Sequence, residues 1–421
     1  MESKWKEMAF GDCAELVRET CQPEEAFGKP YIGLEHIEQG TLRLSGTGIA
    51  EDVTSTKSKF KAKDILFGKL RPYFRKIIQP KFDGICSTDI WVVRSRNGID
   101  QRFVFYWMVS KEFVDIANQG SEGTKMPRAK WDFVAKIKQK LPPLPEQKAI
   151  ALILGALDDK IEMNRKINET LEAMARAIFK SWFVDFDPIP GLGPHKEWQD
   201  SPFGKIPKGW RVGTIGDICE IVIGGDWGND DYFKDGVEVI CLRGVDLENL
   251  RASGHSYAPR RFIKKSSLEK RKMDDHDILI AASGLGPLGR SLWMSESFLY
   301  SYNLPIIYSN FCKRLRTRKP YYAVYIDRIL FDMRSSGEIW EYSTGTALPN
   351  LDSAGLLRGK NIIIPPDFLL EKYYQIIKPI TAKLYNQESI LLSALRDTLL
   401  PKLLSGEIRV TEVERFAEAV L

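Results

Sequence analysis

Three basic stretches are the parts of this 421-residue chain best suited to bind a charged partner. Residues 56–81 carry nine Lys or Arg against one Asp, residues 258–272 carry seven against one acidic residue, and residues 313–319 carry five against none. Basic side chains neutralise phosphates, and Arg can also read the edge of guanine. The net charge of +5 leans the same way. These clusters favour a nucleic-acid partner, although the solvated basic face of an ordinary globular protein would give the same pattern.

A glycine motif, formed by Gly284, Gly286 and Gly289, follows an expected strand. A dinucleotide or S-adenosylmethionine site would need a helix after the motif and an acidic residue about 20 positions later. Pro287 lies inside the motif, and positions 297–326 hold no acidic residue. We therefore interpret the motif as a strand that leads into a loop, and we predict no cofactor.

Other catalytic signatures are missing from the sequence. There is no Walker loop, no HExxH zinc motif, no nucleophile elbow and no adenine-methyltransferase motif. The six cysteines form no CxxC pair and the four histidines lie far apart, so we predict no metal site and reduced thiols in a cytoplasmic protein. The polar start does not resemble a signal peptide, and the longest apolar run, 149–157, is far below the ~20 residues of a membrane span. The sequence predicts no catalytic residue.

The chain repeats itself, and the repeat indicates which elements position these residues. Residues 5–17 match residues 210–222 without a gap, sharing Trp, Gly-Asp, Glu and Val at the same places. GTKMP at 123–127 matches GTALP at 345–349, and a Pro-Pro pair follows each of these segments. A period of this length is too long for a solenoid, whose units reach about 50 residues. We predict two copies of one domain.

Each copy is expected to be a body of mixed α/β and α+β structure, over residues 1–143 and 210–365. In the first body, residues 102–118 are predicted to form one apolar helix. The segment 277–289, with its glycines, aligns with residues 64–77 through a shared Asp-Ile-Leu. The first copy lacks the glycines, which supports a loop over a cofactor site.

A long helix is expected after each Pro-Pro pair, over residues 144–184 and 366–406. A Pro/Gly-rich linker at 185–209 joins the first helix to the second body, and a tail follows at 407–421. Seam residues recur at alternating steps of four and three positions, which is typical of a coiled coil. The predicted seam consists of Leu154, Leu157, Ile161, Asn164, Asn168, Leu171, Ile377, Leu384 and Leu391.

Four polar or helix-breaking residues bear on these helices. Asn164 and Asn168 either fix the register of the seam or face solvent where the helices fray. Pro379 should kink or delay the second helix, and Gly406 should cap its end. With one apolar stripe each, the two helices are expected to pack against each other as an antiparallel coiled coil.

Three stretches of the sequence resemble the specificity subunits of type I restriction–modification systems, and the similarity extends over nearly the whole chain. They are residues 69–76, residues 141–188 and residues 388–410. LPPLPEQ followed by LEAMARAIFKSWFVDF is typical of that family. The second half departs from the pattern, because IPPDFLLEKYYQ at 364–375 replaces the usual Pro-x-x-Glu-Gln.

The resemblance implies that each body is a target-recognition domain that reads one half of a split double-stranded DNA sequence. The two helices would set the gap between the half-sites and dock two methyltransferase subunits. Methylation and ATP-driven cleavage would belong to these partners and to the restriction/translocase subunits bound through them. The chain itself would catalyse no reaction. Because the loops at 67–75 and 280–290 differ in sequence, the target should be asymmetric.

Polar residues beside the repeated landmarks are the candidates for DNA contact. They are chosen by position alone, and each could instead be an ordinary surface residue. The candidates are Lys69, Arg71, Arg75, Lys125 and Arg128 in the first body, and Ser283, Arg290, Thr346 and Asn350 in the second.

Two other functions are alternatives to DNA recognition. A stand-alone S-adenosylmethionine-dependent DNA methyltransferase would use the loop at 283–289, but the expected acidic residue and the methyltransferase motif are missing. A coiled-coil adaptor would carry its basic patches incidentally, and it would enrich no sequence from a random DNA pool.

Overall fold

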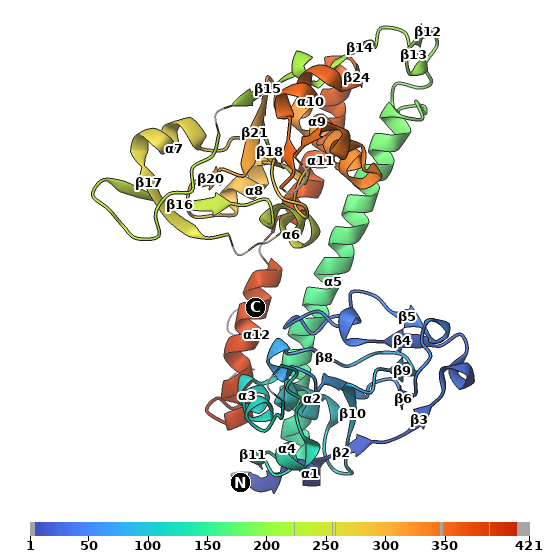
Figure 1. Ribbon diagram of the computed structural model, residues 1–421, viewed down its shortest axis with the longest axis vertical. Coiled ribbons are helices and arrows are strands. Elements are labelled where there is room, and N and C mark those ends of the chain that lie inside the picture. The colour runs from blue at the N-terminus through green and yellow to red at the C-terminus, as the bar shows by residue number, and fades with distance from the viewer. Residues whose placement is uncertain are drawn as a thin grey trace. The chain divides into compact units, whose positions relative to one another are not determined.

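A computed structural model of the protein (Figure 1) describes residues 5–123, 125–222, 224–254, 256, 258–345, 348–386 and 388–410. The chain divides into two compact units, one of residues 1–161 with 392–421 and one of residues 162–391. Each unit contains one body together with parts of the long helices. Among the described residues, no helix is long and apolar enough to cross a membrane.

The first body alternates short strands with short helices, where η marks a 3-10 helix. Its elements are β1 Lys6–Ala9, α1 Phe10–Cys13, β2 Ala14–Val17, β3 Thr20–Cys21, η1 Pro23–Ala26, β4 Pro30–Ile32, η2 Leu34–His36, β5 Gly48–Ile49, η3 Ala50–Asp52, β6 Lys57–Phe60, β7 Ile65–Gly68, η4 Pro72–Phe74, β8 Ile77–Ile78, β9 Gly84–Cys86, β10 Ile90–Ser95, α2 Gln101–Val109, α3 Lys111–Gln119, α4 Trp131–Val134 and β11 Lys138–Leu141. An antiparallel four-stranded sheet has the order β2-β10-β7-β8, and a second sheet has the order β3-β6-β9-β4-β5. A separate ladder pairs β1 with β11.

The second body repeats this plan with longer elements. Its elements are β14 Arg211–Thr214, η5 Ile215–Asp217, β15 Cys219–Val222, β16 Gly236–Leu242, α6 Asp246–Ser253, β17 Arg260–Lys264, α7 Lys265–Arg271, β18 Asp277–Ala281, β19 Ser291–Trp293, α8 Glu296–Tyr300, β20 Ile306–Tyr308, β21 Cys312–Thr317, α9 Pro320–Ser336, η6 Glu338–Tyr342, β22 Ser343–Thr344, β23 Asn350–Leu351, α10 Ser353–Gly359 and β24 Asn361–Ile364. The sheet β15-β21-β18-β19 corresponds strand for strand to β2-β10-β7-β8, and the ladder β14–β24 corresponds to β1–β11. The third sheet, β17-β16-β20, is shorter than its counterpart.

The long helices are α5, Leu144–Phe183; α11, Asp367–Leu384; and α12, Glu388–Ser405. The first matches the prediction closely, but the second is split. Pro379 lies inside α11 without ending it, and the break falls after Leu384. Gly406 follows α12 with φ +77°, the left-handed conformation of a helix C-cap. The linker between α5 and the second body contains a two-stranded hairpin of β12, Trp198–Ser201, and β13, Gly204–Pro207.

Aromatic side chains fill the core of the first unit. Phe10 lies 5.0 Å from Trp107 and 4.9 Å from Phe113, between ring centroids. The cluster also takes in Leu154 of α5 and Leu403 of α12, both fully buried. Burial of a side chain of this size contributes about 1.5–3 kcal/mol, so these two helices gain stability by packing on the body.

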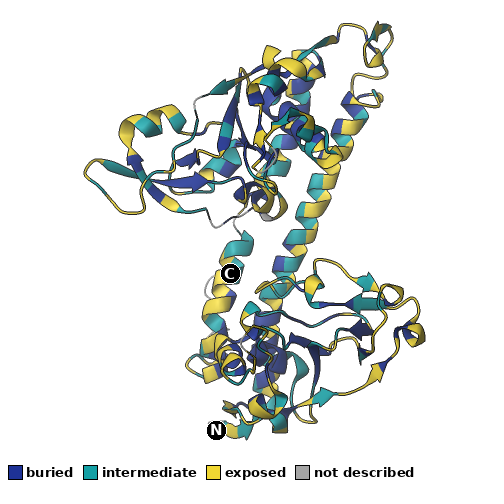
Figure 2. Ribbon diagram, viewed as in Figure 1, coloured by how far each residue is buried: buried dark blue, intermediate teal, exposed yellow. Residues whose placement is uncertain are grey.

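The core of the second unit is centred on the end of α5. The Phe183 ring lies 5.1 Å from Tyr325 of α9 and 5.1 Å from Tyr373 of α11. Trp182 of α5 and Ile377 of α11 are buried in the same cluster. In Figure 2 the buried residues gather in the sheets and in stripes along the helices, as expected where one face of each helix meets a core.

The predicted helix at 102–118 is wrong in its continuity. The structure has two helices, α2 and α3, that meet at Ser110. The Ser110 hydroxyl accepts a hydrogen bond from the Phe113 N–H at 3.2 Å, so this residue caps a new helix. Serine competes with the helix for backbone hydrogen bonds, which favours a cap over a helix interior.

The seam residues on α5 are buried or half-buried, but the last one predicted is not. Leu391 is 68% exposed. The buried positions of α12 are Arg396, Leu400, Leu403 and Leu404. The break between α11 and α12 explains the difference, because a heptad pattern counted across it loses its phase.

Asn164 is buried rather than exposed to solvent. Its side-chain N–H group donates to Glu388 at 3.1 Å and to Ser389 at 3.3 Å, so it joins α5 to the first turn of α12. Further along α5, the Asp158 carboxylate accepts from Arg396 of α12 at 2.8 Å and from the Tyr106 hydroxyl at 2.6 Å. Polar contacts thus connect these two helices where apolar packing alone would permit sliding.

Candidate nucleic-acid interface

An ion pair between a buried aspartate and a partly exposed arginine fixes the start of the same strand in both bodies. Arg94 of β10 binds both oxygens of Asp64, at 2.8 and 2.7 Å, just before β7. Arg316 of β21 binds both oxygens of Asp277, at 2.7 and 2.8 Å, at the start of β18. A fork of this kind fixes orientation as well as distance. The Asp-Ile-Leu repeat is therefore part of a structural frame that carries the loops beyond it.

The loop after this strand has two positive-φ residues in both bodies, although the second loop is one residue longer. Arg71 and Arg75 have φ of +51° and +50°, and Gly284 and Gly289 have φ of +96° and +78°. Glycine adopts these angles at little cost, whereas arginine is strained in them. The glycine motif is followed by strand β19 and not by a helix. Its glycines thus serve a turn that the first body makes with arginines.

A second loop lies against the first in each body. The Arg71 N–H donates to the Pro127 carbonyl at 2.7 Å, and the Gly284 N–H donates to the Pro349 carbonyl at 3.1 Å. Gly123, with φ +99°, starts this loop in the first body, as Gly345 does in the second, with φ +85°. The two Gly-Thr-x-x-Pro landmarks therefore build the same corner, next to the loops that differ in sequence.

A third segment completes this surface, and it was not predicted from the sequence. The Lys69 N–H donates to the Asp89 carbonyl at 2.9 Å, and the Ala282 N–H donates to the Phe311 carbonyl at 2.8 Å. Extending the alignment of the two copies through Arg94 and Arg316 would have placed Asp89 and Phe311 at the same position. We call the three segments together the three-loop surface: residues 69–76, 87–89, 122–123 and 125–128 in the first body, and residues 282–290, 309–311, 344–345 and 348–350 in the second.

Four predicted residues of the first body lie together on this surface. The Arg71 guanidinium donates to the Lys125 carbonyl at 3.2 Å, and Lys125 is exposed. Arg128 is 47% exposed in its side chain and forms a fork on Asp89, at 2.9 and 3.2 Å. This carboxylate raises the pKa of Arg128, so the guanidinium stays charged. Lys69 joins the group through the backbone bond from the Ala129 N–H to its carbonyl, at 2.9 Å.

Arg75 belongs to the same loop but its side chain is used internally. Its guanidinium donates to the Val109 carbonyl at 3.1 Å, at the end of α2. This contact fastens the loop to the body. Arg75 thus lies beside the group without adding a comparable outward-facing charge.

The predicted residues of the second body are brought together only in part. Ser283 and Asn350 form an antiparallel bridge, and Asn350 is exposed. Arg290 instead forms an ion pair with Glu248, in a groove of about 990 Å³ lined by α5, α6 and α9. Thr346 lies outside the described residues.

The exposed side chains of the second three-loop surface are largely apolar. Leu285 is 68% exposed, Phe311 64% and Leu348 61%. The first body has Tyr73 and Met126, with 47% and 48% exposed, among its basic residues. The same frame therefore presents a basic surface in one body and a largely apolar surface in the other, where Arg290 is paired with Glu248.

The basic stretches in the sequence overstate the charge at the surface. Lys57, Arg261 and Arg314 are buried, with at most 5% exposed. Arg314 donates to the carbonyls of Lys270 and Lys272, at 2.9 and 2.8 Å, and so supports the backbone next to α7. Exposed cations remain in every stretch: Lys61, Lys63 and Lys81, then Lys264, Lys265, Lys270 and Lys272, then Arg318 and Lys319.

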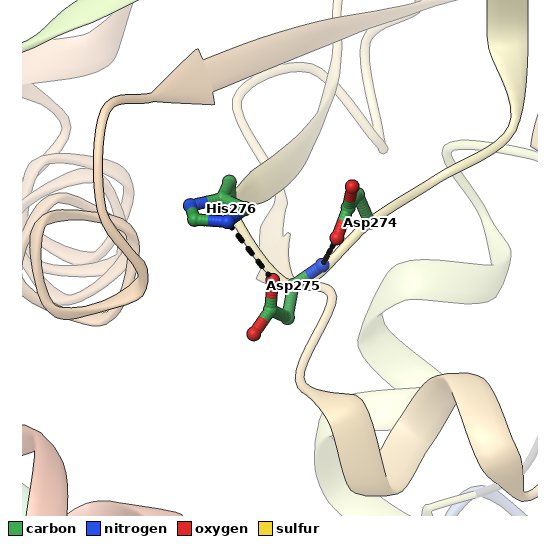
Figure 3. Close-up of side chains that lie close together, drawn as sticks. All are labelled: Asp274, Asp275 and His276. Atoms are coloured by element: carbon green, nitrogen blue, oxygen red, sulfur yellow. Dashed lines mark hydrogen bonds and ion pairs between the residues drawn. The ribbon is translucent and has the colours of Figure 1, made fainter.

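Three residues before β18 place possible metal ligands within 4.8 Å of one another: Asp274, Asp275 and His276 (Figure 3). Hydrogen bonds of the turn account for this arrangement. The Asp275 N–H donates to the Asp274 carboxylate at 2.7 Å, and the Asp274 N–H donates to Asp277 at 2.8 Å. His276 lies 3.4 Å from Asp275. The aligned residues of the first body are Lys61-Ala62-Lys63, so this cluster is a local turn that the repeat does not share.

Comparison with known proteins finds similarity to one kind of protein. Residues 2–173 match the model of the type I restriction modification DNA specificity domain. The type I restriction enzyme MjaIX specificity subunit of Methanocaldococcus jannaschii is 28% identical, over 76% of this chain and 71% of that protein. The HindI specificity subunit of Haemophilus influenzae is 22% identical, over 96% of this chain and 100% of that protein. The chain is thus similar, over most of its length, to specificity subunits of type I restriction–modification systems.

A solved structure supports the fold. The crystal structure of the type I restriction–modification system S subunit from M. genitalium covers 96% of this chain and 96% of its own, with a TM-score of 0.56 at 15% identity. At that identity the likeness concerns the fold alone. Nothing in these comparisons supports a stand-alone methyltransferase or a coiled-coil adaptor.

Proposed function

We propose that this chain is the DNA-recognition subunit of a type I restriction–modification complex, with each body reading one half of a bipartite double-stranded target. One observation carries the proposal beyond this similarity. The same three-loop surface recurs in both bodies on one backbone frame, with different exposed side chains. A frame that is kept while its exposed residues change is the expected design for two related readers of different sequences. The target is therefore expected to be asymmetric.

The exposed cations supply the sequence-independent part of this binding. Lys125 of the first body, and Lys264 and Lys265 of the second, are exposed. Such side chains contact phosphates, and they position a protein on DNA without reading bases. Affinity of the assembled complex should therefore fall steeply with salt, whatever the DNA sequence.

The helices are proposed to act as a spacer between the bodies, packed as an antiparallel coiled coil. α5 is continuous for 40 residues, about 60 Å at 1.5 Å per residue. The bonds from Asn164 to Glu388 and from Asp158 to Arg396 support a fixed register between α5 and α12. Inserting seven residues into both helices should lengthen the gap between half-sites by about 10 Å, or about three base pairs.

Catalysis is proposed to lie in partner subunits, two methyltransferases and, through them, a restriction/translocase. Exposed apolar side chains on the helices support a protein partner. Leu152, Met163 and Met174 on α5 are 49–72% exposed, and Leu391 and Leu395 on α12 are 68% and 47% exposed. Leu391 and Leu395 are four residues apart, on the same face of α12, and exposed apolar residues that lie together are common where a partner covers them. The complex would act on DNA in the cytoplasm.

Mapping of methylated adenines tests the proposal directly. The chain is expressed with the methyltransferase subunit of its own system in cells that lack other DNA methylation. We expect one split, asymmetric motif, absent when this chain is omitted. Methylation that persists without this chain, or a purified chain that transfers methyl groups by itself, would refute the assignment.

A further inference from the structure

Arg128 and Asn350 occupy the same position in the two bodies. Each follows the proline of a Gly-Thr-x-x-Pro landmark. Each forms an antiparallel bridge with the loop opposite, Arg128 with Leu70 and Asn350 with Ser283. The residue after each donates its N–H across the same gap, at 2.9 Å in the first body and 2.8 Å in the second. The two side chains therefore leave equivalent points on the two three-loop surfaces.

Asp89 orients Arg128 in a way that leaves one edge of the guanidinium available. Its carboxylate accepts from Nε at 2.9 Å and from Nη2 at 3.2 Å, which uses two of the five N–H donors. The remaining edge, formed by Nη1 and Nη2, is the fork that pairs with O6 and N7 of guanine. An exposed ion pair adds little to stability, so a purely structural role gives weak reason for this fork.

Asn350 is suited to a different base. Its Nδ2 donates to the Leu348 carbonyl at 3.2 Å, which uses one of two N–H groups. An asparagine side chain pairs with adenine by accepting from N6 and donating to N7, and one N–H is enough for that. Leu348 and Leu285, both more than 60% exposed, lie on the loops beside it and offer apolar contact to a thymine methyl group.

The residue at the position of Asp89 changes together with the residue at the position of Arg128. Where the first body has Arg128, it has Asp89 to orient it, and where the second has Asn350, it has Phe311 in place of the aspartate. A neutral asparagine needs no carboxylate to hold it. The frame is the same in both bodies, so a requirement of the fold does not account for this paired change.

We infer that Arg128 reads a guanine in one half-site and that Asn350 reads an adenine in the other. This inference rests on the proposed function and adds the base class that each body selects. Asp89 is then a positioning residue, which sets the direction of the Arg128 fork without touching DNA.

The experiment uses the complex of this chain with its methyltransferase partner and a pool of random double-stranded DNA. Bound sequences are selected and read for the wild-type chain and for Arg128→Lys, Asp89→Asn and Lys125→Gln. Arg128→Lys should relax a guanine at one position of one half-site, reducing its preference by about 5- to 150-fold. Asp89→Asn should relax the same position by less. The other half-site, read by the unchanged body, serves as an internal control.

Lys125→Gln is the matched control, since it removes an exposed neighbouring cation without changing the fork. It should weaken binding uniformly and leave the motif intact. The double variant Phe311→Asp, Asn350→Arg transfers the pair to the second body. It should replace an adenine by a guanine in the other half-site.

Three results would overturn the inference. They are an unchanged motif with Arg128→Lys, a uniform loss of affinity without relaxation at any position, and failure of both Arg128→Lys and Asp89→Asn to assemble, which would make the pair structural. A wild-type complex that selects no motif would instead refute the proposed function. The two failures are therefore distinct.

Discussion

The two bodies share a backbone frame and differ in the side sheet and in the side chains that the frame exposes. The four-stranded sheets, the closing ladders and the Asp–Arg forks correspond strand for strand. The side sheet has five strands in the first body and three in the second. The exposed side chains of the three-loop surface change from basic to apolar. Stability and recognition are thus divided between different residues, so one can vary without the other.

The start of the long helix is one place where the frame itself differs between the two units. In the first unit, Glu146 accepts from the Trp5 indole at 3.0 Å, and Gln147 accepts from the Asp100 N–H at 2.9 Å. The aligned residues of the second unit, Leu369 and Leu370, are buried in an apolar core. One joint is made by polar contacts and the other by packing, although both hold a helix against a body.

The largest expected effect comes from the frame, where one buried carboxylate has a second arginine. Arg316 and Arg94 are about equally exposed, at 35% and 34%, but Asp277 also lies 3.8 Å from the buried Arg314. Asp277→Ala should lower the free energy of unfolding by about 3–5 kcal/mol, because it leaves buried charge unpaired. Asp64→Ala should cost about 1–3 kcal/mol. Urea unfolding followed by tryptophan fluorescence measures both, and equal losses would argue against a contribution from Arg314.

A smaller effect on stability is expected in the loop that follows β7 in the first body and β18 in the second. Gly289→Ala should destabilise by about 2–3 kcal/mol, since the new methyl group would adopt φ +78° and lie 2.6 Å from Ile339. Arg75→Gly should be nearly neutral, because relief of a strained φ offsets the lost bond to Val109. Thermal unfolding of both variants checks the pair. A strongly destabilised Arg75→Gly chain would show that the arginine contact outweighs the strain.

Docking offers a comparison between the two helices. The single variants Leu391→Glu and Leu395→Glu of α12 should each weaken binding of the methyltransferase subunit by about 10- to 100-fold, without loss of fold. Leu152→Glu on α5 should weaken it similarly if both halves of the chain offer a docking surface. Thr398→Glu, an exposed polar position on α12, is the control. Analytical ultracentrifugation reads the assembly, and unchanged assembly in all three variants would remove these residues from the interface.

The cysteines should show no difference between the bodies. All six are buried and unpaired. Burial raises the pKa of Cys13 to about 11 and those of Cys219, Cys241 and Cys312 to about 12. A raised pKa lowers the thiolate fraction, so reaction with a disulfide reagent should stay slow up to about pH 9. All six thiols should react in denaturant. Fast reaction of one thiol in the native protein would reveal local opening of that body.

Much of the frame could be predicted from the sequence because the chain contains two copies of it. Alignment of the copies placed Asp64 with Asp277, and it identified the glycine motif as a loop. The structure adds the reason. Gly284 and Gly289 have positive φ angles in this loop, as Arg71 and Arg75 have in the first body. A repeat therefore allowed the motif to be read correctly where its letters alone suggested a cofactor.

Features that depend on side-chain partners could not be predicted in this way. Asp89 has no motif of its own, and its role follows only from the fork on Arg128. Arg290 looked equivalent to a DNA-facing residue, yet Glu248 on α6 draws it into a groove. Leu391 was assigned to the seam because the periodicity gave no sign of the break before α12. Each case was decided by a contact distant in sequence.

Each body is proposed to read its own half-site through a frame common to both, and a chimera of the two bodies tests this proposal. Residues 210–365 are replaced by a second copy of residues 5–143, and the methylated motif is mapped in cells with the methyltransferase partner. We expect the second half-site to disappear and the first half-site to occur twice in the new motif. An active chimera that keeps the original asymmetric motif would contradict it.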